Sequence, residues 1–298
     1  MASNPLSPMT PPVRDVRYYF EDGGVIFLCQ NVLYKLHKSR LSLKSEFFME
    51  MFELPHNPDP NAGNGQDDDH PISLDESHIE NTDFRHLLIF LYDQDDLPNP
   101  TSLEFFVSVL RLSTVWRIPS GVKYVKAHLP SHPDFSAAIQ LKLSRQYEVD
   151  GWAAPAFRTL MELPLDRTTL SDAENMGVIA YYKLAQLKYK VAEFKTALAY
   201  HPPDVIHSFG CTDENICSRI WESFWWGGFA KQLLHPDNQK PPAAILLEVD
   251  STKGLLTQMN KICLQNTMEY IWENNPFDEE QVLADAAWAD LSDWLFTL

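Results

Sequence analysis

Three cysteines and one histidine in the second half of the chain carry the side chains that zinc prefers. They are His207, Cys211, Cys217 and Cys263, and three thiolates with one imidazole would close a tetrahedral structural site. The offset between Cys211 and Cys217 is wider than the usual two to four residues between zinc-binding cysteines. On one helix it would separate the two sulfur atoms by about 9 Å along the axis. A site would require Cys211 to precede the helix, which Gly210 and Thr212-Asp213-Glu214 allow because they resemble a helix entry. Buried free cysteines are the more common case, so we expect them and no bound zinc.

The sequence contains none of the common catalytic motifs. A nucleophile elbow, a Walker-type phosphate loop, a dinucleotide-binding glycine motif and the His-Glu-x-x-His metalloprotease motif are all absent from it. With only eleven glycines, the chain has few positions where its backbone can approach a phosphate closely. We therefore expect no catalytic residues, no cofactor and no enzymatic activity.

The negative charge of the chain argues against nucleic acids and membrane surfaces as partners. The formal net charge is −17, so phosphate backbones and anionic lipids repel it. The lysines of one predicted helix stand among apolar residues and indicate a solvated face; they are Lys183, Lys188, Lys190 and Lys195. Residues 1–12 contain four prolines and no apolar core, which predicts a disordered lead and not a signal peptide. Few cysteines and no membrane-spanning apolar run predict an intracellular protein, in the cytoplasm or the nucleus.

Two apolar stripes near the C-terminus have a helical period. Trp221, Trp225 and Phe229 share one face at spacings of four, which is more typical of a core than of a ligand box. The last predicted helix is acidic, and its apolar stripe includes Leu291, Trp294 and Leu295. We expect this helix to dock on its own domain, and the open alternative is that these three residues form a surface that inserts into a partner's groove.

The elements that must position these residues fall into two groups. In the first half, a hairpin is predicted over 18–20 and 25–28, because Asp22-Gly23-Gly24 suits a tight turn. Residues 55–70 are rich in Pro, Gly and Asp and predict a flexible acidic loop. The other expected elements of this half are strands at 32–36 and 71–74 and helices at 47–52, 83–92, 101–116 and 122–129. Beyond a hinge at 130–133 the patterns predict helices at 135–148, 152–162, 171–181, 183–199, 213–234, 251–273 and 278–297.

The order strand, strand, strand, His-Lys, helix resembles the start of a BTB/POZ domain. The residues that carry this resemblance are Asp22, Leu36, His37, Lys38, Leu41, Ser45, Phe47, Phe48, Met51 and Phe52. The helix, Ile118-Pro119, helix order resembles the second half of such a domain, so the likeness covers about residues 14–130. Scattered positions over 143–177 resemble the helical region that follows BTB domains in many fungal, basidiomycete-type proteins.

The resemblance implies an α+β fold in which a small sheet flanked by helices precedes a mostly α-helical domain. The expected organisation is a disordered Pro-rich lead at 1–12, a BTB/POZ-like domain at 13–130 and a helical domain at 134–298. BTB domains are known as protein-interaction modules, so the resemblance implies a non-enzymatic adaptor with protein partners. Many of them self-associate, and some carry cullin ubiquitin ligases.

Departures from the family pattern leave alternatives open. Family members that exchange strands in a dimer have an extra helix and strand before the first hairpin, whereas only twelve residues precede Val13 here; we therefore expect weak self-association. Arg40 stands where the family usually has an aliphatic residue, and we expect it on the outer face, where Arg40→Ala would be nearly silent for stability. A cullin-ligase substrate adaptor and a zinc-stabilised regulatory or transcription-associated factor remain alternative functions.

Overall fold

The chain forms two compact units in a computed structural model, residues 1–135 and 136–298. The structure describes residues 11–54, 64–74, 78–93, 102–236, 238, 240–274 and 277–296. The boundaries 13–130 and 134–298 remain predictions about which fragments would fold alone.

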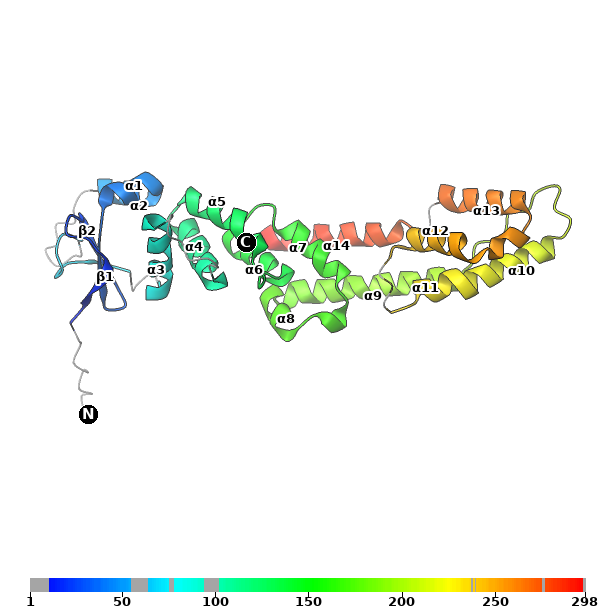
Figure 1. Cartoon of the computed structure of the whole chain (residues 1–298), viewed down its shortest axis with the longest axis horizontal. Coiled ribbons are helices and arrows are strands. Elements are labelled where there is room, and N and C mark those ends of the chain that lie inside the picture. Colours follow the sequence, from blue (N-terminus) through cyan, green and yellow to red (C-terminus); the bar gives the residue numbers. More distant parts are fainter. Residues whose placement is uncertain are drawn as a thin grey trace, which may run out of the picture. The chain divides into compact units, whose positions relative to one another are not determined.

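The first unit contains a mixed four-stranded sheet in the order β1-β3-β2-β4. Figure 1 labels two of its strands, β1 and β2. The strands are β1 (Val13–Tyr19), β2 (Val25–Cys29), β3 (Val32–Leu36) and β4 (Ile72–Ser73). Strands β2 and β3 pair antiparallel, whereas β1 lies parallel to β3 and β4 lies parallel to β2. Strand β1 therefore does not form a hairpin with β2, and the predicted hairpin over 18–20 and 25–28 is wrong.

The actual hairpin turn lies between β2 and β3. Gln30 and Asn31 have positive φ angles of 44° and 66°, as a two-residue turn between twisted strands requires. Gly23 has another purpose: a Cβ there would lie 2.9 Å from the carbonyl carbon of Lys35. The backbone on either side binds β3, because Phe20 N–H donates to Lys35 O at 2.9 Å and Gly24 N–H to Leu36 O at 2.8 Å. Glycine is needed here for close approach of two backbones.

Within the described part of this unit, five helices flank the sheet: α1 (Lys38–Lys44), α2 (Glu46–Glu53), α3 (Asn81–Tyr92), α4 (Leu103–Val115) and α5 (Pro119–His128). The core between sheet and helices is aromatic. Phe84 packs edge-on against Phe27, Tyr34 and Trp116, with ring centroids 5.0 to 6.0 Å apart. Such pairs stabilise a core beyond the area that they bury. Ser45 joins the layers, because its hydroxyl accepts from Phe48 N–H at 3.0 Å and donates to Trp116 O at 2.5 Å.

Residues 64–70 form a hydrogen-bonded turn, where the sequence predicts part of a flexible loop. Gly65 O accepts from Ile26 N–H at 2.8 Å. The Asp68 carboxylate accepts from Arg14 Nε at 2.8 Å and from the Tyr19 hydroxyl at 2.5 Å. The acidic run is thus tied to β1 by one of its carboxylates. The other part of the predicted loop, 55–63, lies outside the described residues.

Every regular element in the described residues of the second unit is a helix. Its helices are α6 (Ala137–Tyr147), α7 (Ala153–Glu162), α8 (Leu170–Met176), α9 (Val178–Tyr200), α10 (Glu214–Phe224), α11 (Lys231–Leu233), α12 (Pro242–Lys253), α13 (Lys261–Asn274) and α14 (Glu279–Phe296). A π-helical turn, Trp225–Ala230, links α10 to α11. The single helix predicted at 251–273 is wrong: Gly254, with φ 58°, ends α12, and α13 begins at Lys261.

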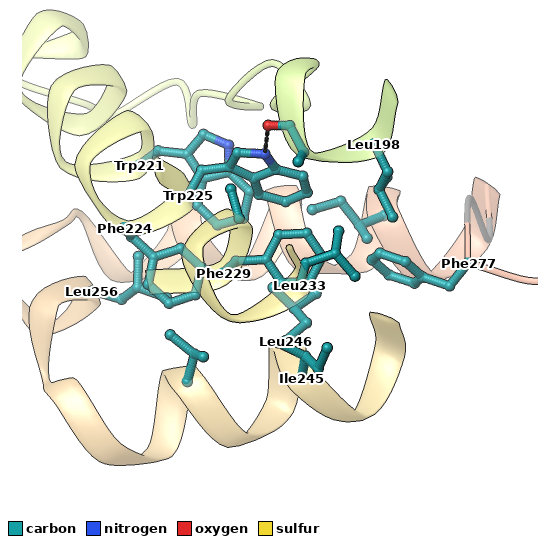
Figure 2. Close-up of a cluster of buried hydrophobic side chains, with 14 of the residues drawn as sticks. Leu198, Trp221, Phe224, Trp225, Phe229, Leu233, Ile245, Leu246, Leu256 and Phe277 are labelled. Atoms are coloured by element: carbon teal, nitrogen blue, oxygen red, sulfur yellow. Dashed lines mark hydrogen bonds between the residues drawn. The ribbon is translucent and has the colours of Figure 1, made fainter. Parts of the chain in front are cut away.

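Two buried clusters hold the second unit together, and α9 contributes to both. One cluster packs Leu184 and Leu187 of α9 against α6, α7 and Leu291 of α14. The other, shown in Figure 2, gathers Leu198 of α9 with the aromatic residues around Trp225. The predicted aromatic stripe is therefore core: Trp221, Trp225 and Phe229 are each at most 1% exposed.

The last helix docks on its own unit, as favoured from the sequence. Leu291 is 0% exposed, so it does not belong to a partner-binding surface and that alternative is wrong for this residue. The Asp290 carboxylate pairs with Lys183 of α9, and Glu280 lies 3.2 Å from the Lys195 ammonium. The side chains of Trp294 and Leu295 lie outside the described residues. Among the described residues, no helix combines the length and apolarity that crossing a membrane requires.

Candidate functional site

The residues of the BTB-like signature build the junction between sheet and first helices. His37, just before α1, contacts the Asp22 carboxylate through Nε2 at 3.1 Å. The His37 ring packs on the Phe20 ring, with 4.8 Å between the ring centroids. The Phe20 ring in turn stacks on the Tyr92 ring, with 5.1 Å between the centroids. The His37 N–H also donates to the Tyr92 hydroxyl at 3.2 Å. Asp22 and His37 thus position α1 and the end of α3 relative to β3.

The remaining signature residues share a packing role. Leu36, Leu41, Ser45 and Phe48 are at most 2% exposed, and Lys38, Met51 and Phe52 are half-buried. Side chains this deeply buried cannot reach a partner without unfolding. The structure therefore brings the predicted signature residues together as a framework between the sheet and the first helices.

Arg40 lies on the outer face, as predicted, but it binds the end of α3. Its guanidinium donates from Nε and Nη2 to Leu91 O at 3.1 and 2.7 Å, and it lies 4.5 Å from the Tyr92 ring centroid. The last carbonyls of a helix have no partner within the helix, and a cation close to them is favoured by the helix dipole. The expectation of a nearly silent Arg40→Ala substitution is therefore revised.

We expect Arg40→Ala to destabilise the first unit by about 1–2 kcal/mol, from two lost hydrogen bonds and an exposed cation–π contact. Arg40→Lys keeps the charge without the planar fork and should lose an intermediate amount. Hydrogen exchange of the α3 backbone, with chemical denaturation of the full chain, measures both. If Arg40→Ala exchanges at the wild-type rate, the guanidinium does not cap α3.

An exposed tyrosine face on α9 was missed by the sequence reasoning. Tyr182, Tyr189 and Tyr200 are 59%, 65% and 62% exposed, and their spacings of seven and eleven residues return to one face of a helix. Tyr200 also packs edge-on against Trp226 at 5.6 Å, and Trp226 is 45% exposed. The repeat of tyrosine at seven and eleven was the available signal. Exposed tyrosines are among the side chains that most often anchor protein interfaces.

Lys188 has a perturbed pKa but serves the fold. Burial, with a smaller effect of the Lys195 charge, lowers the pKa of Lys188 to about 8. Its ammonium donates to Met161 O at 2.5 Å and to Leu163 O, two carbonyls at the end of α7. An ammonium group has three N–H donors, and here it donates to two carbonyls that the end of the helix leaves without a partner. Lys188 therefore caps the C-terminus of α7. This arrangement gives no reason to assign Lys188 a catalytic role.

The four candidate zinc ligands meet in the second unit. One potential ligand atom from each of His207, Cys211, Cys217 and Cys263 lies within 4.8 Å of the others, and no disulfide joins the cysteines. Cys211 precedes α10, which begins at Glu214, so the condition stated from the sequence is met. Burial opposes ionisation of the Cys263 thiol, but hydrogen bonds with Ser208 outweigh it and lower the pKa of Cys263.

Comparison with protein families gives one match. Residues 22–132 match the BTB/POZ domain, which confirms the resemblance over most of the first unit. Strand β1 lies before the matched residues, and the helical unit lies beyond them. No curated protein matches the chain.

Proposed function

We propose that this protein is a non-enzymatic adaptor, from the premise that residues 22–132 form a BTB/POZ domain, a protein-interaction domain. The observation that carries the proposal is the division of the chain into two units, each with its own buried core. An adaptor needs two binding surfaces, and two units can offer one each. We also infer that the helical unit is of the kind that follows BTB domains in fungal proteins.

On the first unit, the apolar side chains left exposed support protein contacts. Val16, Leu43 and Leu54 are 104%, 82% and 66% exposed. The strand before the matched domain, β1, already pairs with β3 of its own chain. Because β1 is already paired within its own chain, this pairing supports weak self-association.

On the second unit, the tyrosine face of α9 is the surface that we assign to a partner. Tyr189 and Tyr200 present large, rigid rings with a polar tip, and such side chains bury area at little entropic cost. The Tyr189 hydroxyl already donates to Glu193 at 2.8 Å, which fixes its orientation. A face of this composition suits an apolar protein surface that also offers hydrogen-bond acceptors.

Affinity purification of the full chain from its native cell, followed by mass spectrometry, tests the adaptor proposal. We expect some of the captured proteins to be recovered with the Tyr189→Ala, Tyr200→Ala double variant in amounts more than about tenfold lower than with the wild type. Loss of one or two anchor residues has an effect of this size. Tyr270→Ala is the matched control, because Tyr270 is an exposed tyrosine, 47% accessible, on α13. It should retain every partner.

Two outcomes would count against the proposal. If no protein is enriched over an unrelated bait, the chain is not an adaptor under those conditions. If the double variant retains all partners, the tyrosine face is not a binding surface. If the double variant still captures a cullin, the protein is a substrate adaptor of a cullin ubiquitin ligase.

A further inference from the structure

Four metal-binding side chains from three segments converge in the helical unit. His207 and Cys211 come from the irregular segment between α9 and α10, Cys217 from α10 and Cys263 from α13. The Cys211 and Cys217 sulfur atoms are 3.7 Å apart. Two thiolates bound to one zinc ion at 2.3 Å in a tetrahedral site lie about 3.8 Å apart. This pair already has the separation that zinc requires, and the widest pair must close by about 1 Å.

The histidine of this cluster has a buried polar atom that the fold does not satisfy. His207 Nδ1 is buried and has no hydrogen-bond partner among the described residues. Its other ring nitrogen, Nε2, lies 3.4 Å from the Ser218 hydroxyl. Leaving a buried nitrogen unpaired costs free energy. A metal-bound histidine has this division of roles, one nitrogen on the metal and the other held by a polar neighbour.

The sulfur atoms receive backbone donors as metal-bound thiolates do. Ser208 N–H donates to Cys263 Sγ at 3.2 Å, and Asn260 N–H donates to Cys217 Sγ at 3.5 Å. Neighbours that hydrogen-bond the ligands orient them and stabilise their negative charge.

We propose that His207, Cys211, Cys217 and Cys263 bind one zinc ion in a closed structural site. Thiolate and imidazole ligands select zinc over magnesium or calcium, and four protein ligands leave no open position for catalysis. Binding displaces a proton from each of the three thiols. The expectation of no zinc rested on the wide Cys211–Cys217 offset and on how common buried free cysteines are; the offset is no obstacle, because Cys211 precedes α10.

The zinc ion would fasten an irregular segment to two helices. Residues 201–213 have no helix or strand, and the contacts that hold them include Pro203 O to Trp221 Nε1 at 2.7 Å and Ile206 N–H to Thr267 Oγ1 at 3.0 Å. Beyond Ile206, the metal ligands supply the next attachments. The segment carries Phe209, whose side chain is fully exposed, so the site would also fix where this ring is presented.

Metal analysis of the full chain tests the proposal. Protein purified with reductant, incubated with zinc sulfate and passed over a desalting column should carry about one zinc ion per chain. Cys217→Ser and Cys263→Ser should lower that content by more than about tenfold. Cys29→Ser is the matched control: Cys29 is a buried cysteine of β2, and its thiol donates to Ile79 O. It should keep the zinc.

Cobalt provides a measurement that needs no variant, should Cys217→Ser fail to fold. Cobalt(II) added to the metal-free full chain should give the intense visible absorption of a tetrahedral complex, with thiolate charge-transfer bands in the near ultraviolet. Chelation should speed hydrogen exchange of residues 206–213. Three results would each overturn the proposal: only the weak absorption of octahedral cobalt, equal zinc content in wild type and Cys217→Ser, or a Cys211–Cys217 disulfide in protein purified with reductant and zinc.

Discussion

Leu41→Asp should unfold the first unit while the helical unit stays folded. Leu41 is 2% exposed and is the one side chain of α1 that reaches the core. The substitution removes a buried Leu, worth about 2–5 kcal/mol, and adds a carboxylate with no partner, which costs several kcal/mol more. The sum is comparable with the whole stability of a domain, about 5–15 kcal/mol.

Leu43→Asp is the matched control for this experiment. It places the same charge on the same helix, but Leu43 is 82% exposed, so the cost should stay within about 1 kcal/mol. Hydrogen exchange with mass spectrometry reads the two units of the full chain separately. Full protection of β2, β3 and α4 in the Leu41→Asp protein would show that α1 does not pack as described.

Trp225→Ala should be the most damaging truncation in the helical unit. The Trp225 side chain is 0% exposed, and its ring centroid lies 4.3 Å from the ring centroid of Phe229. Its indole N–H donates to Ala199 O at 3.0 Å, a carbonyl in the last turn of α9; Figure 2 shows this bond at the top of the cluster. Truncation leaves both a cavity and an unpaired carbonyl, so we expect a loss of about 3–5 kcal/mol.

The neighbouring tryptophan separates this packing effect from the loss of an indole. Trp226 is 45% exposed, and Trp226→Ala should cost no more than about 1 kcal/mol. Thermal unfolding followed by circular dichroism should show a fall of roughly 10 °C for Trp225→Ala and a small shift for Trp226→Ala. Because α9 contributes to both clusters, the whole unit should unfold in that transition. Equal shifts for the two variants would contradict the burial described here.

The sequence predicted best where periodicity alone determines structure. The tryptophan stripe repeats at helical spacing, and the structure buries it, as it buries Leu41 and Phe48 of the family signature. Hydrophobic periodicity reports which face of an element is buried. Periodicity does not report which strands pair. The Asp22-Gly23-Gly24 motif therefore indicated that glycine is needed at this point, but not that the need is a close approach to the backbone of β3. The true turn at Gln30 and Asn31 has a weak signal, because Gln rarely adopts positive φ.

Signals for helix ends were present where the long helix at 251–273 was predicted. Gly254 adopts a left-handed conformation and ends α12, as glycine commonly does after a helix. Pro242 begins the same helix at its first position, where proline is favoured. Apolar content over 255–271 outweighed these local signals. The backbone conformations of a few residues decide where a helix ends, and the composition of a segment does not show these conformations.

The convergence of the four metal-binding side chains could not be predicted from spacing. Cys263 is 46 residues beyond Cys217 in the sequence, and the two side chains meet only because both belong to the same buried cluster of the helical unit. Likewise, Arg40 reaches α3 across 51 residues of sequence. Long-range contacts of this kind depend on tertiary structure, so the residue types were recognised while their arrangement was not.

Strand β1 has a consequence for where this protein can be cut. The matched BTB/POZ residues begin at 22, but β1 covers Val13–Tyr19 and supplies the outermost strand next to β3. A fragment trimmed to the family boundary would bare the backbone groups of β3 that β1 now pairs. It would also remove Tyr18, which is 1% exposed. An unpaired strand edge of this kind recruits other chains and promotes aggregation. The family match and the smallest fragment that we expect to be soluble therefore start at different residues: the match begins at residue 22, and the fragment needs β1 from Val13.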